Sequence, residues 1–352
     1  MSIITVNREI KKEDLGITLP HEHLFVDLSF CYEIPEETNR KELGKQKVDL
    51  NNLYLVKRNP YIIRDNLILS EEDLITSEIL EFKKAGGTTI VDQTTIGLGR
   101  SPIAIRNISN ITGINIVMGC GYYMSSTLPD YILKKSESDL VKNMLKEIYY
   151  GVGNTNIKPG VIGEIGMGPV IEDWGKKLLK IATKVQKETG LPIFVHILAV
   201  PVAGFTGKLQ GLKAIDILKR NGANLEKVVI CHTDAQIDLD YIKKIISSGA
   251  YTEFDHFGEE FYVEYCDFFM DRDIDRINAI KILVEGGYIK RILISQDVCF
   301  KTDLISYGGG GYAHILNNLV PIMLKRGISK ESISTIMIEN PQELLDIKDR
   351  YL

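Results

Sequence analysis

The stretch SEEDLITSEILEFKKAGGTTIVDQT, residues 70–94, contains two consecutive secondary-structure patterns. Its first part carries apolar residues at helical spacing, and its last part is a short apolar run rich in β-branched residues. Ser70 and Asp73 predict a capping box at the start of the helix, and the glycine pair at 86–87 predicts its end. A helix that leads directly into a buried strand is the unit from which parallel α/β sheets are built.

The same alternation of helical stretches and short apolar runs recurs along the chain, without an internal repeat, a low-complexity tract or a Pro/Gly/Ser-rich linker. Eight such strands predict an α/β fold of the (β/α)8 TIM-barrel type, a single domain over residues 1–352 with right-handed crossovers. An open, doubly wound sheet is the alternative that this pattern leaves. The predicted strands lie in GITLPHEHLFVDLS (16–29), GGTTIVDQT (86–94), INIVMGCGYY (114–123), PGVIGEIG (159–166), LPIFVHI (191–197), EKVVICHTD (226–234), GAYTEFDHFG (249–258) and KRILISQDVCF (290–300).

A long polar stretch, residues 31–69, separates the first predicted strand from the first long helix. It contains Pro35 and Pro60 and is too long for a simple turn. We expect an insertion after the first strand that partly covers the mouth of the barrel.

Composition narrows the class of protein. The chain has 352 residues, of which 44% are hydrophobic, enough to build a large core. Its formal net charge of −5 shows no basic excess and argues against nucleic acid as the main partner. Five scattered cysteines without a CxxC pair indicate reduced thiols, and no apolar run has the length of a signal peptide or a membrane span. We therefore expect a cytoplasmic protein that acts on a small molecule.

Polar side chains interrupt the first predicted strand at His21, Glu22 and His23. Such groups are costly to bury without a partner, and two histidines at i and i+2 point to the same side of a strand. Further His, Glu and Asp residues stand at the ends of other predicted strands, where barrels of this type hold their active sites. The complete set is His21, His23, Glu164, His196, His232 and Asp297.

Four imidazoles and two carboxylates on one rim are the ligands that two adjacent divalent ions need. Nitrogen and oxygen ligands without a thiolate suit zinc or another first-row metal. Cys231 precedes His232, but the alternation of side chains along a strand predicts that it points the other way. The sequence also lacks the GxSxG motif of a serine nucleophile. We therefore predict two divalent metal ions per chain, with Zn²⁺ as the first choice.

With these residues placed, the sequence resembles the phosphotriesterase family of the amidohydrolase superfamily over nearly its whole length. The resemblance implies two ions that share a bridging carboxylate and a bridging hydroxide, in a chain that can form a homodimer. The deeper ion would be held by His21, His23 and Asp297, and the more exposed ion by His196 and His232. The matching motifs are LPHEHLFVD (19–27), GVIGEIG (160–166), VH (195–196), CHTD (231–234), ISQD (294–297), YGGGGYAHIL (307–316) and ENPQELL (339–345).

The bridging residue departs from the best-known members of this family, in which a carboxylated lysine often joins the two ions. This chain carries Glu164 in the motif GEIG, and the nearest lysine, Lys158, stands at the wrong end of the predicted strand. A glutamate supplies the same pair of anionic oxygens. We therefore expect a Glu164 bridge and no dependence on bicarbonate.

The predicted mechanism follows from the positive charge of two metal ions held by these ligands. Two adjacent divalent ions polarise a bridging water into hydroxide at neutral pH. We expect this hydroxide to attack an ester or lactone carbonyl. Asp297 is the predicted catalytic residue, because it can take the proton from the hydroxide and pass it to the leaving oxygen.

The substrate is predicted from the C-terminal motifs, which most resemble a branch that opens phosphorylated sugar lactones. The first choice is therefore an aldono-1,4-lactone 5-phosphate. Arg276 and Lys301 follow the seventh and eighth predicted strands, where such barrels bind phosphate, and the loop 307–312 offers backbone N–H groups. Tyr123 aligns with a tyrosine that related lactonases place beside the metals, and His256 is expected to line the pocket.

Structural alternatives stand beside these assignments. Tyr123 could pack the rim, Lys301 could be a surface lysine, and Arg276 could be a helix charge balanced by nearby aspartates. Arg272 is a second basic candidate at the same rim, and His314 is expected to pack or cap within the last helix. The alternative functions are a phosphotriesterase-like or other carboxylester or amide hydrolase with the same centre, or a non-catalytic metal- or anion-binding barrel.

Overall fold

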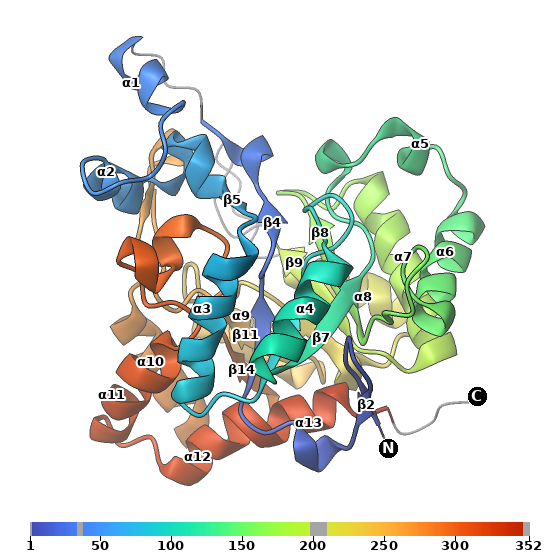
Figure 1. The fold of residues 1–352 in the computed structure, drawn as a ribbon. Coiled ribbons are helices and arrows are strands. Elements are labelled where there is room, and N and C mark those ends of the chain that lie inside the picture. The colour runs from blue at the N-terminus through green and yellow to red at the C-terminus, as the bar shows by residue number, and fades with distance from the viewer. Residues whose placement is uncertain (1, 34–37, 198–209, 348–352) are drawn as a thin grey trace.

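The computed structural model describes residues 2–33, 38–197 and 210–347, and within them eight parallel strands form one central sheet (Figure 1). Each of the eight predicted strands is present. Their bounds are β3 Thr18–Glu22, β6 Thr89–Asp92, β7 Asn115–Cys120, β8 Val161–Met167, β9 Ile193–Ile197, β10 Val228–Ile230, β11 Tyr251–Phe254 and β14 Ile292–Ile294.

Neighbours in this sheet follow one another along the chain, from β3 through to β14, and every paired neighbour is parallel. The first and last strands also meet: the Asp297 N–H donates to the His21 carbonyl at 3.2 Å, and the His21 N–H donates to the Ser295 hydroxyl at 3.1 Å. A doubly wound sheet would reverse its strand order at a switch point, and the order of the described strands does not reverse. The fold is therefore a TIM barrel.

Helices alternate with the strands and surround them (Figure 1). The main helices are α3 Glu72–Lys84, α4 Pro102–Thr112, α6 Glu137–Tyr150, α7 Asp173–Thr189, α8 Gln210–Asn221, α9 Leu239–Ser247, α10 Asp273–Glu285, α11 Val320–Lys325, α12 Lys330–Ser334 and α13 Asn340–Leu345. Shorter helices are α1 Thr38–Leu43, α2 Leu53–Arg58 and α5 Asp130–Leu133, and π-helical turns precede α11 at Ile315–Leu319 and α13 at Thr335–Glu339. Three small antiparallel sheets of two strands each pair β1 Ile3–Ile4 with β2 Glu9–Ile10, β4 Val26–Asp27 with β5 Ile68–Leu69, and β12 Tyr262–Val263 with β13 Phe268–Phe269.

Helix α3 shows where local prediction succeeded and where it failed. It ends at Ala85 and is followed by Gly86 with a φ of +98°, a conformation that glycine adopts without steric strain. The predicted capping box is wrong, because the N-cap residue is Glu71 and no side chain caps the first turn. The Ile75, Ile79 and Phe82 side chains on one face of α3 are fully buried against the barrel.

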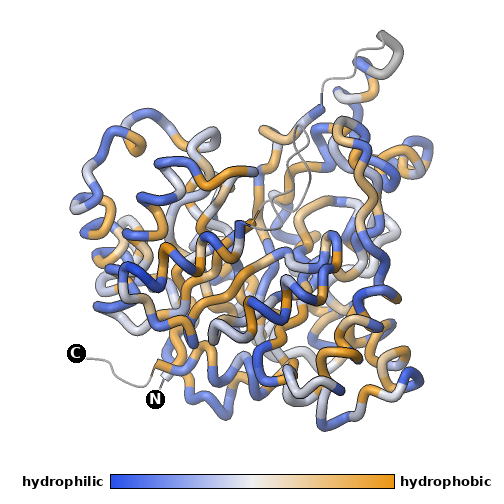
Figure 2. The backbone as a smooth tube through the Cα atoms, turned by 180° about the vertical axis from the view of Figure 1, so that it is seen from behind, coloured by the Kyte–Doolittle hydropathy of each residue, from blue (hydrophilic) through white to orange (hydrophobic). Residues whose placement is uncertain are grey.

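Alternate residues of the strands belong to two separate apolar clusters. One cluster joins the outer faces of the strands to the helices. The other takes single residues from seven strands, which can meet only inside the barrel: Val91, Val117, Val161, Phe194, Val229, Tyr251 and Leu293. The central strands are accordingly mostly hydrophobic in Figure 2, whereas the surrounding helices alternate in hydropathy. None of the described helices is long and apolar enough to cross a bilayer.

Residues 31–69, apart from the undescribed residues 34–37, include α1 and α2 and lie at the end of the barrel opposite α13 (Figure 1). They form a small core of their own from Val48, Val56, Ile62 and Ile63. Cys31 and Tyr61 of this segment line the cavity above the ends of the strands. Because these two residues line the cavity, we propose that the segment partly covers the barrel mouth.

Candidate metal centre

The structure brings the six predicted ligand residues together at one end of the barrel. His21 lies in β3, Glu164 in β8 and His196 in β9, while His23, His232 and Asp297 lie within three residues of the ends of β3, β10 and β14. Overlapping groups of these side chains place their nitrogen and oxygen atoms within 4.8 Å of one another. Five of the six side chains are buried and His196 is half-buried.

The Glu164 carboxylate stands between the four imidazoles. Its Oε1 atom lies 3.4 Å from Nε2 of His23, and its Oε2 atom lies 3.1 Å from Nδ1 of His196. Nε2 of His21 and Nε2 of His232 lie 3.6 and 3.5 Å from the same Oε2. Burial alone raises the pKa of Glu164, but the surrounding imidazoles lower it well below its usual range.

The backbone of Gly163 explains how Glu164 reaches this position. Gly163 has a φ of +143°, which L-residues with a Cβ rarely adopt. A Cβ at this position would lie 2.8 Å from both the Cβ and the carbonyl oxygen of Phe194 on the next strand. The glycine in the motif GEIG therefore allows β8 and β9 to approach closely beside the Glu164 carboxylate.

Asp297 closes the other side of the cluster. Its Oδ1 atom lies 3.2 Å from Nε2 of His23 and 3.7 Å from Nε2 of His21. Asp297 and His232 both have left-handed backbones, with φ of 52° and 60°. Non-glycine residues rarely adopt this conformation, and it persists where the surroundings hold it. Here it turns both side chains toward the barrel axis.

This turn at His232 also overturns the prediction for Cys231. The Cys231 sulfur does not point away from the site, because it lies inside the barrel within 4.8 Å of ligand atoms of His21, Glu253 and Asp255. Burial raises the pKa of the Cys231 thiol well above its usual value. The strand-alternation rule failed because the chain leaves the regular strand geometry after Ile230.

The residues fit divalent ions. Among the described residues, Nε2 of His21 and Oδ1 of Asp297 are buried without a hydrogen-bond partner, which costs about 1–3 kcal/mol per group when nothing else satisfies it. Their separation of 3.7 Å is too long for a hydrogen bond but suits two ligands held about 2.0–2.2 Å from one ion. The carboxylates also raise the pKa of His23 to about 10 against the lowering effect of burial, so the cluster favours positive charge.

A small cavity of about 120 Å³ opens beside the cluster, and its wall includes five of the six ligand residues, all except His21. Drug-sized ligands usually occupy about 300–1,000 Å³, so this cavity suits a small substrate. Lysine and arginine are absent from its described lining. The remaining lining residues are mostly apolar: Leu28, Phe30, Cys31, Tyr61, Tyr123, Met124, Ala235, His256, Glu259, Phe261, Met270, Cys299 and Phe300.

Tyr123 and His256 both line this cavity, where they were predicted to lie. The Tyr123 hydroxyl is 3.0 Å from Nε2 of His196, and the Trp174 indole N–H donates to the Tyr123 carbonyl at 3.2 Å. Nδ1 of His256 is 2.8 Å from Oδ1 of Asp234, which leaves the Nε2 edge of the ring free of a close hydrogen bond.

Arg276 does not reach the substrate cavity, and the prediction that it binds a phosphate is wrong. Its side chain is fully buried. The guanidinium donates to the Asp234 carboxylate at 3.0 Å, to Asp273 at 3.2 Å and to the Glu259 carbonyl at 3.1 Å. The alternative interpretation, in which nearby aspartates balance the charge of Arg276, is correct for Asp273. Arg276 itself, however, is buried and not a surface residue of the helix. Arg272 is exposed and pairs with Asp275.

Replacing Arg276 with methionine is therefore expected to affect stability. The variant should lose about 3–5 kcal/mol of unfolding free energy, because the buried Asp234 carboxylate loses its guanidinium partner and keeps only its contacts with His256 among the described residues. In the wild type, burial raises the pKa of Asp234 but His256 and Arg276 lower it to about 2. This contribution is complete above about pH 4, the ordinary pKa of aspartate, and is lost as the pH falls toward 2.

Urea unfolding of both proteins between pH 7 and pH 4 measures this effect. In the Arg276→Met variant, Asp234 should have a raised pKa because it has lost the guanidinium, so the deficit should be largest at pH 7 and shrink on acidification. A variant with wild-type stability and a selective loss of affinity for a phosphorylated substrate would contradict the structural role.

Lys301 and the glycine-rich loop also lie apart from the metal cavity, which corrects both predictions. The Lys301 ammonium is 2.9 Å from Asp65 and 3.4 Å from Glu71, so it ties the segment before α3 to the loop after β14. Three N–H groups of the loop, at Gly308, Gly309 and Gly311, donate to carbonyls of residues 303–305 and are not offered to an anion.

The glycine-rich loop instead borders a second cavity of about 470 Å³. This cavity is larger than the one beside the metal cluster, but its charged lining is mainly acidic, with Glu259, Glu260, Asp273 and Asp303. An acidic wall disfavours a phosphate. His314 borders the same cavity and pairs with Asp273 at 2.8 Å. It directly precedes the π-helical turn before α11 and does not cap that turn with its side chain, so it does not lie within the last described helix, α13, where it was expected.

The prediction missed the carboxylates beneath the ligands. Glu253 and Asp255 stand at alternate positions at the end of β11, are fully buried and contact His21 and His232. The signal was present in the stretch TEFD, where two acidic residues interrupt an otherwise apolar strand at a spacing of two.

Comparison with known proteins agrees with the geometry. The profile of the Phosphotriesterase family matches residues 1–345. An N-acetyltaurine hydrolase of Xenopus tropicalis is 37% identical over 98% of this chain and 97% of its own length. A phosphotriesterase-related protein of Nematostella vectensis is 38% identical over 98% of each chain.

The fold is also close to that of a solved relative. The crystal structure of a resiniferatoxin-binding protein from Rhodobacter sphaeroides matches with a TM-score of 0.94 and 33% identity, covering 98% of this chain and 95% of the other. The conserved architecture and the long sequence match agree with the cluster of His, Glu and Asp residues at the barrel mouth. This chain belongs to the phosphotriesterase family of metal-dependent hydrolases.

Proposed function

We propose that this protein hydrolyses a small N-acylated amine of the N-acetyltaurine type, at a centre that binds two divalent ions. The observation that carries the proposal is the convergence of four imidazoles and two carboxylates beside a cavity of about 120 Å³. Several relatives that align over 98% of the chain are N-acetyltaurine hydrolases. Nitrogen and oxygen ligands make Zn²⁺ the first choice of metal.

Each ligand has an assigned place in this proposal. His21, His23 and Asp297 would hold the deeper ion, His196 and His232 would hold the outer ion, and Glu164 would serve both. Two such ions supply a nucleophilic water at neutral pH and polarise a carbonyl.

The chain's own residues carry out the remaining steps. Asp297 accepts the proton of the attacking water and transfers it to the leaving nitrogen, since an amine leaves only when it is protonated. The hydroxyl of Tyr123 and Nε2 of His256 line the cavity as the polar groups that orient the substrate. The aromatic wall excludes bulk water from the reacting amide.

A phosphorylated sugar lactone is a weaker candidate. The two basic residues assigned to its phosphate are occupied in ion pairs elsewhere, and lysine and arginine are absent from the described cavity wall. A phosphate dianion at the far end of the cavity would therefore be desolvated without a cationic partner. A singly charged sulfonate or carboxylate requires less compensation.

A substrate panel tests this proposal. We expect kcat/KM for N-acetyltaurine to exceed that for a 1,4-lactone 5-phosphate by roughly a hundredfold, the value of one or two missing charged contacts. The panel should include N-acetylglycine, the unphosphorylated lactone and an aryl phosphotriester, with metal content measured in the same preparation. Preferential hydrolysis of the lactone phosphate, or no amide hydrolysis by protein with two bound ions, would exclude the proposed substrate class.

A further inference from the structure

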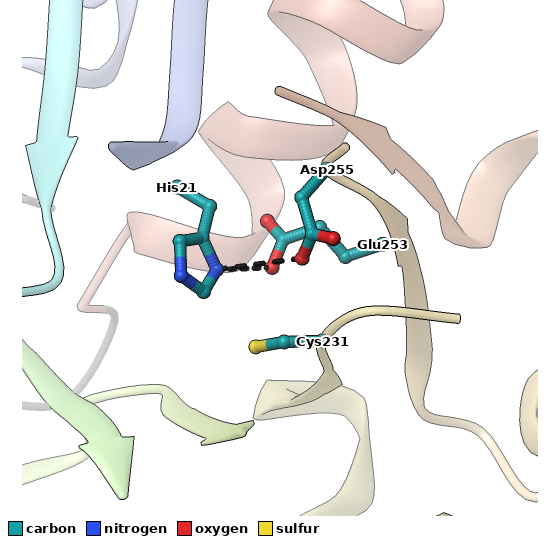
Figure 3. Close-up of side chains that lie close together, drawn as sticks. All are labelled: His21, Cys231, Glu253 and Asp255. Carbon is teal, nitrogen blue, oxygen red and sulfur yellow. Dashed lines mark hydrogen bonds and ion pairs between the residues drawn. The ribbon is translucent and has the colours of Figure 1, made fainter. Parts of the chain in front are cut away.

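Three buried side chains, Cys231, Glu253 and Asp255, lie together beside the proposed ligand His21 (Figure 3). Strand β11 supplies both carboxylates from positions two residues apart, so both side chains point to the inside of the barrel. Neither carboxylate lies in the wall of the substrate cavity. Their function must therefore be exerted through the residues that they contact.

Glu253 is paired with His21. Its Oε2 atom lies 3.0 Å from Nδ1 of His21, and both side chains are fully buried. A hydrogen on Nδ1 that is donated to this carboxylate leaves the lone pair on Nε2. That Nε2 atom faces Glu164 and Asp297 and has no hydrogen-bond partner of its own. The pairing thus presents the correct nitrogen to the deeper ion.

Asp255 is paired with His232 in the same way. Its Oδ1 atom lies 3.1 Å from Nδ1 of His232, and its Oδ2 atom accepts the backbone N–H of His232 at 2.9 Å. The two bonds hold both the ring and the left-handed backbone of this residue. Nε2 of His232 then faces Glu164, 3.5 Å away. Asp255 thus orients a ligand of the outer ion, and its second contact with a proposed ligand, from Oδ2 to Nδ1 of His21, is longer at 3.5 Å.

We infer that Glu253 and Asp255 are positioning residues, each dedicated to one metal ion of the centre. The inference rests on the two-ion centre of the proposed function. A carboxylate that accepts the second N–H of a ligating histidine fixes its orientation and makes the ligating nitrogen more basic, and its loss typically weakens metal binding by about 10–100-fold. Substituting Glu253 or Asp255 should therefore weaken the binding of one metal ion at a time.

Cys231 offers a competing arrangement, in which its thiolate, both carboxylates and Nδ1 of His21 hold a third, deep ion. The position of the hydrogen bonds argues against it, since Nδ1 of His21 already lies at hydrogen-bond distance from Glu253. Burial and the neighbouring carboxylates both raise the pKa of the thiol, which favours the neutral, non-ligating form. The positioning inference therefore expects two ions per chain and an inert Cys231.

The test measures zinc stoichiometry and affinity by competition with a chromophoric chelator, without an activity assay. Glu253→Gln and Asp255→Asn are compared with wild type, with Cys231→Ser as a neighbouring control. Glu78→Gln is a matched control, because Glu78 is a buried carboxylate on α3 that accepts the N–H groups of Ile305 and Ser306. Each β11 variant should bind one of the two ions 10–100-fold more weakly, and both controls should match wild type.

Assignment of each carboxylate to one ion comes from double-mutant cycles. The Glu253→Gln effect should vanish in a His21→Ala background and persist in a His196→Ala background. The Asp255→Asn effect should vanish with His232→Ala instead. A merely structural role would not produce this pattern of coupling. If Glu253→Gln fails to fold, Glu253→Asp keeps the charge on a shorter arm and should show a smaller loss of the same ion.

Three results would overturn the inference. Unchanged affinity for both ions in the folded Glu253→Gln and Asp255→Asn proteins would show that the pairs are only structural. Three ions in wild type, with one lost in Cys231→Ser, would establish the deep ion site in its place. Wild type that binds no zinc would remove the metal centre itself, and the proposed function would fail together with the inference, whereas the first two results leave that function intact.

Discussion

Replacing Glu164 with glutamine is expected to lower hydrolysis on the order of a thousandfold and to reduce metal content from two ions per chain to less than one. The carboxylate is 3.1–3.6 Å from nitrogen atoms of all four imidazoles, so it contacts every histidine of the centre. Glutamine keeps the shape but removes the negative charge. Removal of one partner from a buried ionic cluster costs about 3–5 kcal/mol, which corresponds to roughly two to four orders of magnitude in metal affinity.

Metal analysis and kcat measured on the same preparation test this prediction. The Glu78→Gln variant undergoes the same chemical change at another buried carboxylate and should keep both ions. Added bicarbonate should leave the wild-type rate unchanged, because the proposed bridge is a glutamate and the nearest lysine, Lys158, precedes β8. A Glu164→Gln protein with two ions and normal kcat would show that Glu164 is merely a buried carboxylate within β8.

The barrel and the convergence of the six candidate ligand residues were predictable because both depend on patterns that are local in sequence. A strand of a parallel sheet is buried on both faces, so β6 and β9 appear as short apolar runs that are easy to find. The ends of parallel strands meet at one rim in any barrel. Histidines and acids that follow those runs must therefore converge, whatever the details of packing.

The substrate contacts were not predictable because they depend on where a long side chain ends. Arg276 stands after the seventh strand, as a phosphate-binding residue would, but its guanidinium turns into the protein and pairs with Asp234, 42 residues away in sequence. Lys301 likewise turns toward Asp65, 236 residues away. Sequence position identified the correct corner of the barrel, and long-range ion pairs decided the direction of both side chains.

Cys231 illustrates a different limit. The alternation of side chains along a strand is reliable only while the backbone stays in the β region. β10 ends at Ile230, and His232 adopts a φ of 60°, so Cys231 and His232 both face the interior. When a residue other than glycine adopts a left-handed backbone, the sequence carries no signal of it. Such strained residues are found mainly at functional sites, and His232 is a candidate metal ligand.

Asp297→Asn is expected to lower kcat for N-acetyltaurine by about 10²–10⁴-fold, the usual contribution of a positioned acid–base group. Asparagine retains a carbonyl oxygen that can still serve as a ligand, so both ions should remain measurable, but it can neither accept a proton nor return one.

Two substrates that differ in their leaving group isolate this role. The amide nitrogen must be protonated in order to leave, whereas the phenolate of p-nitrophenyl acetate departs without a proton. If Asp297 transfers the proton, the variant should lose much more activity toward the amide than toward the ester. An equal loss for both substrates, with both ions in place, would restrict Asp297 to ligation and require another donor for the leaving amine. His256 and Glu259 in the cavity wall would then be the groups to replace, because both present polar atoms to the cavity beside Asp297.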